Sequence, residues 1–451
     1  MKVPDERNMA AITRFAAGAL EQEIPPQVVA QGVACFIDWF AVALGAHDEP
    51  GAKAVRLTAR RLWPGSGDAI VLLDKPAASG ASALVNGTLS HCLDFDDLHV
   101  ASVAHLSGAT LAAALAVGSA TRSGEEAILR AFICGFEVGA RLGAGGFGSA
   151  LNHRGVHATG VIACLSATVA AGVLMRLDEG QMAHALGVAA TQCGGLTASF
   201  GTMAKPFHAG GAALGAVMAV ELAKAGFEAA ADVLEPGGGL ASALVQDGLT
   251  RIPALSFDGT WEILNNTFKP YASCLMTHAP IDAARSLAPA CRDRPIAAIT
   301  VYVNPLLPKV AGIAAPHTAL EGKFSTAFCV ALGLSGHRAT DRDFSAATVE
   351  SRPLRDIAKK VRLEVDPAMP KTAARMRVEF SGGGHVDESV PLALGNPENP
   401  MSEDDLKRKF LALVEPVLGG EADELFACLK GFRTPGSLSA IARLTSKQVK
   451  Q

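Results

Sequence analysis

Apolar residues recur at the three- and four-residue spacing of a helix through much of residues 24–226. The clearest runs cover residues 28–44, 106–120, 159–174 and 182–192. Small residues repeat one helical turn apart within such stretches, at Gly160, Ala163, Ala167 and Ala171, and at Gly211, Gly215 and Ala219. This pattern predicts helices that pack closely against one another in a water-soluble bundle.

The pattern changes after residue 259. Residues 296–303, 361–365 and 376–380 cluster or alternate β-branched side chains, as strands do, and turn residues flank them. Residues 318–334 between them again have helical spacing. The sequence therefore predicts a small α+β unit over residues 267–395.

Helical patterns return near the C-terminus. Residues 402–405, SEDD, resemble a capping box and predict a helix over 406–418, followed by shorter helices over 421–429 and 437–444. Because helical residues precede and follow the insert, we expect a mostly α protein whose large all-helical domain is built from residues 1–266 and 396–451. The cleft between two such domains would be the natural substrate site.

Composition excludes several classes of function. A net charge of −4 gives no basic footprint for nucleic acid. The nine cysteines are scattered without a C-x-x-C motif, which favours reduced, intracellular thiols. The first residues lack the apolar core of a signal peptide, and the most apolar stretches, such as 210–223, fall short of a membrane span or carry glycine and polar interruptions. We expect a cytoplasmic protein that binds neither nucleic acid nor membranes.

Titratable residues are densest in residues 91–105, HCLDFDDLHVASVAH. Groups that titrate on both sides of neutrality predict acid–base chemistry. The candidates here are Asp94, Asp96, Asp97, His99 and His105. Two alternatives remain for this segment. Carboxylates and imidazoles are common metal ligands, so it could be a metal site, or it could be a solvated loop in which one aspartate caps a helix. The remaining His and Cys show none of the short, regular ligand spacings typical of zinc motifs.

Two further polar segments precede predicted helices. His157 ends the segment HRGVH, and a helix N-terminus depresses the pKa of a histidine, so His157 is a candidate neutral base or donor. The segment 200–211, FGTMAKPFHAGG, holds Lys205 and His208, and its glycines, Gly210 among them, would let backbone approach a ligand closely. Lys205 is either a snorkelling side chain or a desolvated anion clamp.

A fourth segment, KPYASCLMTHAPID at residues 269–282, offers several reactive side chains at the expected domain junction. These are Lys269, Tyr271, Ser273, Cys274, Thr277 and His278. Cys274 with His278 would suit a thiol nucleophile, but no local signature of a cysteine protease or dehydrogenase supports that interpretation.

In order along the chain, these four segments resemble motifs of the MmgE/PrpD family, which includes 2-methylcitrate dehydratases, cis-aconitate decarboxylases and iminodisuccinate epimerases. The family's DFDD-plus-His segment resembles residues 94–97 with His105. Its G-[FV]-H-x-T-G and K-P-x-H-x-G segments resemble residues 155–160 and 205–210. Its K-P-Y-x-S-C-x-x-T-H-x-x-I-D segment is matched almost letter for letter by residues 269–282. The resemblance covers nearly the whole chain.

The resemblance implies an all-helical domain made from both chain ends, an inserted α+β lid over residues 267–395, and a homodimer. It implies a small di- or tricarboxylate substrate and neither a metal nor an organic cofactor. Its functional positions map to five residues that we expect to be catalytic: Asp94, His105, His157, Lys205 and Lys269. We expect polar neighbours to bind the substrate, namely Asp97, His99, His208, Tyr271, Ser273 and His278.

The chemistry of such a site is consistent with these residue types. A proton next to a carboxylate is very weakly acidic, so its removal needs a placed base and cations where enolate-like charge develops. The leading hypothesis is a cofactor-free lyase of the hydratase or dehydratase type. An epimerase or a decarboxylase acting on a similar acid, and a non-catalytic carboxylate binder, are the alternatives.

Two positions depart from the family pattern. Leu98 stands where a threonine is usual, and Phe328 stands where a tyrosine is expected. Losing a hydroxyl from a pocket built to bind one shifts specificity by orders of magnitude. We therefore expect the substrate preference to differ from those of standard family members.

Overall fold

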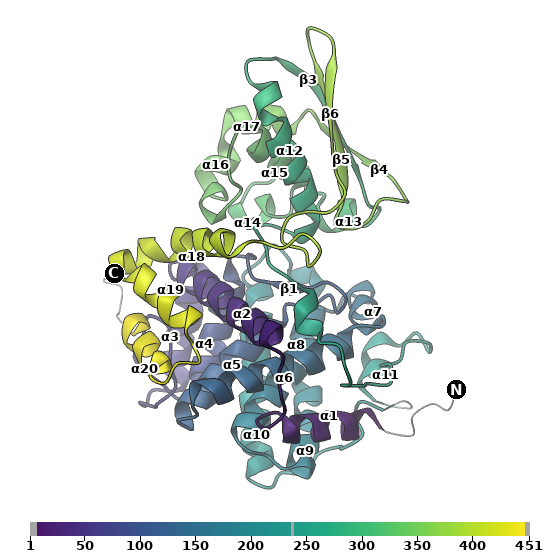
Figure 1. Ribbon diagram of the computed structural model, residues 1–451. Coiled ribbons are helices and arrows are strands. Elements are labelled where there is room, and N and C mark those ends of the chain that lie inside the picture. The colour runs from purple at the N-terminus through teal and green to yellow at the C-terminus, as the bar shows by residue number, and fades with distance from the viewer. Residues whose placement is uncertain (1–6, 236–238, 447–451) are drawn as a thin grey trace. The chain divides into compact units, whose positions relative to one another are not determined.

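The computed structural model describes residues 7–235 and 239–446, and the chain divides into two compact units. Unit 1 holds the residues up to Thr267 together with those from Glu403 onward, and unit 2 holds Phe268–Ser402. Figure 1 shows the helices of unit 1 and the sheet of unit 2. The prediction of a mostly α protein is confirmed.

Unit 1 is a bundle to which both ends of the chain contribute. Its helices from the N-terminal part are α1 (Asn8–Gly18), α2 (Pro26–Gly45), α3 (Pro50–Leu62), α4 (Ser79–Cys92), α5 (Leu106–Ala120), α6 (Glu125–Gly143), α7 (Phe147–His153), α8 (Ala158–Leu174), α9 (Glu179–Gln192), α10 (Ala204–Lys224) and α11 (Leu240–Val245). The C-terminal part adds α18 (Glu403–Leu418), α19 (Ala422–Lys430) and α20 (Ser437–Thr445). Helices α18 and α19 pack on α2, so the last segment of the chain is part of the same core (Figure 1).

The sequence had predicted an entirely helical unit 1, but this unit also contains two short strands. Strand β1 (Leu98–His99) pairs antiparallel with β2 (Asn266–Thr267). Leu98 lies opposite Thr267, and His99 lies opposite Asn266. These two-residue strands are too short to give a recognisable alternation, and their pairing joins segments far apart in the sequence.

Small residues let the central helices of unit 1 approach one another closely. Helix α10 packs against α4, α5 and α8. A Cβ added at Gly210 would lie 2.1 Å from Oγ1 of Thr88 and 2.5 Å from the carbonyl oxygen of Leu84. Gly210 therefore lets α10 touch the backbone of α4 and does not serve the close ligand approach that the sequence had suggested.

Two described helices, α2 and α10, are long and apolar enough to cross a membrane by length and composition alone. The expectation that apolar stretches fall short of that length is therefore wrong for these two helices, although both contain the glycine and polar residues that the sequence analysis noted. The most apolar window of α2 is 67% buried inside the structure and that of α10 is 61% buried. Packing against neighbouring helices accounts for their apolar composition.

Unit 2 contains a four-stranded sheet in the order β4-β3-β5-β6. The strands are β3 (Ile296–Val303), β4 (Val361–Val365), β5 (Ala374–Phe380) and β6 (His385–Val390). Strand β3 runs parallel to β4 and antiparallel to β5, and β5 pairs antiparallel with β6. The sequence HVDESV of β6 was not predicted, because its side chains alternate only between exposed and half-buried positions.

The sheet of unit 2 packs on helices through one apolar face. Helix α12 (His278–Cys291) contacts β5 and β6 and packs against α15 (Thr326–Leu334). The helix predicted over 318–334 is broken into α14 (Ala319–Gly322) and α15. The remaining helices are α13 (Leu307–Ala311), α16 (Ala346–Glu350) and α17 (Arg352–Ala358).

The C-terminal end of unit 2 lies later than the expected residue 395. The N–H of Gly395 donates to the carbonyl of Asn399 at 2.8 Å, and the Asn399 side-chain amide donates to the carbonyl of Leu392 at 3.2 Å. The N–H of Phe268 donates to the carbonyl of Gly395 at 3.1 Å. These bonds keep the segment after Gly395 with unit 2 up to Ser402.

We predict that Gly210→Ala and Gly211→Ala have opposite effects on stability. At Gly210 the new methyl group overlaps α4, so the variant should lose about 2 kcal/mol of unfolding free energy. At Gly211 the nearest atoms to a new Cβ belong to the Phe207 ring at 3.7 Å, so alanine should be neutral or gain up to ~1 kcal/mol. Urea unfolding followed by circular dichroism measures both, and equal shifts would contradict the close helix crossing.

Candidate active site

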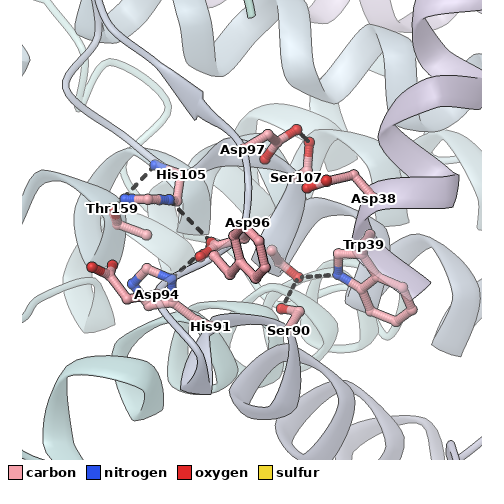
Figure 2. Close-up of polar contacts among 12 residues, drawn as sticks. Asp38, Trp39, Ser90, His91, Asp94, Asp96, Asp97, His105, Ser107 and Thr159 are labelled. Atoms are coloured by element: carbon pink, nitrogen blue, oxygen red, sulfur yellow. Dashed lines mark hydrogen bonds and ion pairs between the residues drawn. The ribbon is translucent and has the colours of Figure 1, made fainter. Parts of the chain in front are cut away.

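A sharp turn directly follows α4 and positions the acidic side chains of the site. Helix α4 ends at Cys92, and Asp94 has a backbone φ of +50°, in the left-handed region that few non-glycine residues adopt. Aspartate tolerates this conformation better than most residues. The turn brings the carboxylates of Asp94 and Asp96 back toward the last turn of α4, which carries His91 (Figure 2).

Two histidines share one carboxylate oxygen next to this turn. Nδ1 of His91 lies 2.7 Å from Oδ2 of Asp96, and Nδ1 of His105 lies 3.1 Å from the same oxygen (Figure 2). All three side chains are buried. An ionised carboxylate only accepts hydrogen bonds, so each imidazole presents Nδ1–H to Asp96 and, when neutral, carries its lone pair on Nε2.

The charge states of this triad follow from burial and from the contacts. Burial lowers the pKa of His91 to about 4, because the cost of desolvating the imidazolium exceeds the attraction of Asp96. Burial alone would raise the pKa of Asp96, but His105 and His91 hold that pKa well below its ordinary value. Near neutral pH the triad therefore contains an ionised Asp96 and a neutral His91.

A second pair of histidines lies beside the first. Nδ1 of His157, the residue before α8, is 2.9 Å from Nδ1 of His208 in the first turns of α10. The ring of His157 stacks on that of His91 with centroids 5.9 Å apart, and Phe200 meets its edge at 4.9 Å. Burial, followed by the charge of Lys205, lowers the pKa of both His157 and His208, which favours their neutral forms.

Lys205 is the cation of the site. Its ammonium forms an ion pair with Asp94 and lies 5.6 Å from the centroid of the Phe200 ring. Its side chain is only 8% exposed, so it is a desolvated ammonium and does not snorkel to the surface. The same charge lowers the pKa of His91, His157 and His208, which lie around it.

Three helices begin at this cluster. His105 precedes α5, His157 precedes α8, and Lys205 lies in the first turn of α10. The N–H of His105 donates to Oγ1 of Thr159 at 3.1 Å, which ties the start of α5 to that of α8. Helix N-termini carry partial positive charge, so their convergence beside a lysine favours an anionic ligand.

Asp97 and His99, which the sequence predicted to bind substrate, lie in other buried groups. Asp97 accepts hydrogen bonds from Ser107 and from Asn266, and Figure 2 shows it turned away from His91. Burial raises the pKa of Asp97 to about 7. His99 contacts Ser102 and Glu262 through its two ring nitrogens, at 3.0 and 3.3 Å.

The predicted residues of the fourth segment belong to unit 2. The Tyr271 hydroxyl donates to the Asp282 carboxylate, and burial raises the pKa of that tyrosine. Oγ of Ser273 lies 2.8 Å from Oγ1 of Thr277, and Nε2 of His278 lies 3.2 Å from the carbonyl oxygen of Ser273. Lys269 is buried near the start of the unit. Tyr271, Ser273 and His278 lie together within unit 2, because the His278 ring contacts both of the others.

The two departures from the family pattern occupy different environments. Phe328 is buried in α15 of unit 2, where its ring contacts Phe344 at a centroid distance of 6.0 Å. Leu98 lies in β1 of unit 1, opposite Thr267.

The catalytic and substrate-binding residues assigned from the sequence did not include His91, Asp96 or Phe200, although Asp96 was named as an acid–base candidate. His91 and Asp96 belong to the densest titratable segment of the chain, so the signal was present. The family motif drew attention to Asp94 and His105 instead. Nothing in the sequence marked Phe200 as a site residue, because its contacts with His157 and Lys205 depend on the tertiary structure.

The triad also has the composition of a metal site. One ligand atom from each of His91, Asp96 and His105 lies within 4.8 Å of the others. A divalent cation bound through the Nδ1 atoms of the two histidines would have to displace any protons on those atoms. The structure pairs Oδ2 of Asp96 with Nδ1 of both imidazoles, while Nε2 of His91 and Oδ1 of Asp96 have no hydrogen-bond partner among the described residues.

The fold and the site define a predominantly helical protein with a buried acid–base cluster suited to a small anion. The N-terminal domain model of the MmgE/PrpD family matches residues 10–251, and the C-terminal domain model matches residues 271–430. The chain belongs to the MmgE/PrpD family.

Curated relatives match three quarters or more of the chain. A cis-aconitate decarboxylase from Aspergillus terreus is 27% identical over 438 residues, which cover 90% of this chain and 89% of the relative. The mouse (Mus musculus) cis-aconitate decarboxylase is 28% identical over 363 residues, covering 75% and 72%. A cis-aconitate decarboxylase-like protein from Aspergillus oryzae is 24% identical, covering 93% and 92%.

We predict that His91 makes the protein less stable as the pH falls from about 6.5 to 4. Its pKa is near 4 in the folded state and near 6.5 when unfolded, so the unfolded chain takes up the proton first. This residue alone should cost about 3 kcal/mol over that range. Urea unfolding across pH should give a shallower slope for His91→Gln than for the wild type, whereas the exposed-site control His317→Gln should keep the wild-type slope. Parallel curves for all three proteins would contradict the buried neutral imidazole.

Proposed function

We propose that the protein is a lyase that acts on a small di- or tricarboxylate by moving a proton at the carbon next to a carboxylate. One observation carries the proposal. In unit 1, a buried lysine, an ionised aspartate and neutral imidazoles meet at the start of three helices. Cations beside a base are what the enolate-like charge of such a reaction requires.

In the proposed reaction each group has a defined role. Lys205 and the helix N-termini bind a substrate carboxylate and stabilise the negative charge that develops on it. Nε2 of His91, which is buried and has no hydrogen-bond partner among the described residues, takes the proton from the neighbouring carbon. The electron pair left behind forms the double bond as the hydroxyl group leaves.

The remaining groups complete the proton balance. The imidazolium formed at His91 gives its proton to the leaving hydroxyl, which departs as water, while the neutral His157–His208 pair donates a hydrogen bond to that hydroxyl. Ionised Asp96 stabilises the imidazolium that forms at His91, because it accepts the Nδ1 proton. In the reverse direction the same residues add water to the double bond.

Decarboxylation is the second candidate, and the names of the relatives favour it. In that reaction the substrate loses CO2, and the cluster must deliver a proton to the carbon that lost it. Lys205 would then stabilise the carbanion through the carboxylate that remains. Phe328 and Leu98 lack the hydroxyl groups usual in the family, so we expect a substrate other than cis-aconitate to react fastest.

Proton NMR in D2O with a panel of di- and tricarboxylates separates the candidates. A new alkene signal without CO2 release identifies dehydration, and CO2 release with deuterium at the neighbouring carbon identifies decarboxylation. Deuterium exchange without net product identifies an epimerase. Thermal stabilisation by an acid that undergoes neither exchange nor turnover would refute the lyase and leave a carboxylate binder.

We predict that Lys205→Gln lowers kcat/KM at least ~100-fold, because the developing negative charge loses its cation. The variant also removes the cation paired with buried Asp94, which should cost about 3–5 kcal/mol of stability. The double variant Asp94→Asn/Lys205→Gln should recover most of that stability without recovering turnover. Lys224→Gln, at the exposed end of the same helix, is the control and should keep wild-type activity. Wild-type turnover in folded Lys205→Gln would remove the lysine from the mechanism.

A further inference from the structure

A second buried ion pair lies next to the turn that carries Asp94 and Asp96. Nζ of Lys409, on α18, is 2.6 Å from Oδ1 of Asp38, on α2. The same ammonium donates to the carbonyl oxygen of Phe95 at 2.6 Å and lies 4.0 Å from the centroid of the Phe95 ring. Both charged side chains are at most 4% exposed.

The residues of this turn contact two different groups. Asp94 pairs with Lys205, and Asp96 pairs with His91 and His105. Phe95 contacts Lys409, and Asp97 accepts hydrogen bonds from Ser107 and Asn266. The acid–base cluster therefore depends on a loop that is held from its other side by α2, α5, α18 and β2.

Stability alone does not explain the charged residues around Lys409, because burying them is unfavourable. Two buried carboxyls, Asp38 and Asp97, accompany one ammonium, and burial raises the pKa of both. Buried ion pairs are often no more stable than apolar side chains of the same volume. What an apolar replacement would lose is the hydrogen bond from Lys409 to the Phe95 carbonyl. That carbonyl belongs to the planar peptide unit leading into Asp96, so holding its oxygen fixes the plane from which Asp96 projects.

We propose that Lys409 is a positioning residue for the reaction of the acid–base cluster. Its ammonium holds the Phe95 carbonyl and so directs Asp96 toward His91 and His105, which keeps both imidazoles in the Nδ1–H form. The catalytic role of this inference rests on the proposed function. The C-terminal helix α18 thereby completes a site whose acid–base residues all lie earlier in the chain.

Two variants separate the effect of the hydrogen bond from Lys409 to the Phe95 carbonyl from the effect of the buried charge on Asp38. Asp38→Asn keeps the Lys409 donor on the Phe95 carbonyl whether or not the amine is protonated. Asp38→Asn/Lys409→Met removes only that donor from the same background. Lys407→Met is the matched control, since Lys407 is on the same helix but its partner is the exposed Asp423. We expect kcat to fall about 10- to 100-fold in the double variant, with KM changed less than about threefold, and to stay near wild type in the other two.

A spectroscopic readout tests the positioning without turnover. In protein labelled with ¹⁵N-histidine, Nδ1–H and Nε2–H imidazoles have distinct nitrogen shifts, and His91→Gln and His105→Gln assign the two signals. We expect the Nδ1–H form in the wild type, Asp38→Asn and Lys407→Met. It should be lost in Asp38→Asn/Lys409→Met and in Asp96→Asn, which is the positive control. If methionine prevents folding, Asp38→Asn/Lys409→Gln replaces it, because glutamine is shorter and its amide stops short of the Phe95 carbonyl.

The outcomes separate the two proposals. A folded double variant with wild-type kcat and wild-type histidine signals would overturn the role of Lys409. A wild type that turns over no acid, but whose histidine signals depend on Lys409, would refute the lyase and support the positioning. Loss of both the tautomer and turnover in the double variant supports both.

Discussion

Because Gly210 has no side chain, helix α10 lies directly against the backbone of α4, and the rest of the site follows from that contact. The crossing brings the first turn of α10 to the last turn of α4, so Lys205 reaches the turn that follows His91. Once these ends meet, Asp94 and Lys205 leave water together, and each supplies the opposite charge that the other needs. A bulkier residue at the crossing would separate the helices and, with them, the two halves of the acid–base cluster.

Burial affects the carboxylates and the imidazoles of the site differently. The carboxylates stay ionised where a cation or imidazole N–H faces them, as at Asp96. The imidazoles of His91 and His157 stay neutral because the low-dielectric interior and Lys205 both disfavour a second positive charge. A base and a cation thus exist side by side near neutral pH. This combination is difficult to maintain in water and is what abstraction of a weakly acidic proton needs.

The turn at residues 94–97 links this chemistry to the overall architecture of unit 1. Its two faces are held by two lysines that come from different parts of the chain. Lys205 is 111 residues from Asp94, and Lys409 is 371 residues from Asp38. The C-terminal segment is therefore part of the support of the site. This arrangement gives a physical reason for building a helical unit from both ends of the chain, with a second unit inserted between them.

Local patterns in the sequence were enough to predict helices α2, α5, α8, α9 and α18 to α20 of unit 1, the strands β3 and β4 with most of β5, and the concentration of acid–base chemistry near residues 91–105. Helical and strand periodicities are properties of neighbouring residues, and so is a dense cluster of Asp and His. The contacts that these Asp and His side chains make could not be predicted from neighbouring residues. In DFDD the side chains follow no period, because the positive φ of Asp94 breaks the repeat, and so the sequence could not separate Asp96 from Asp97. Tertiary structure alone decided that Asp96 holds two imidazoles while Asp97 meets Ser107 and Asn266, because those contacts depend on how closely distant helices pack.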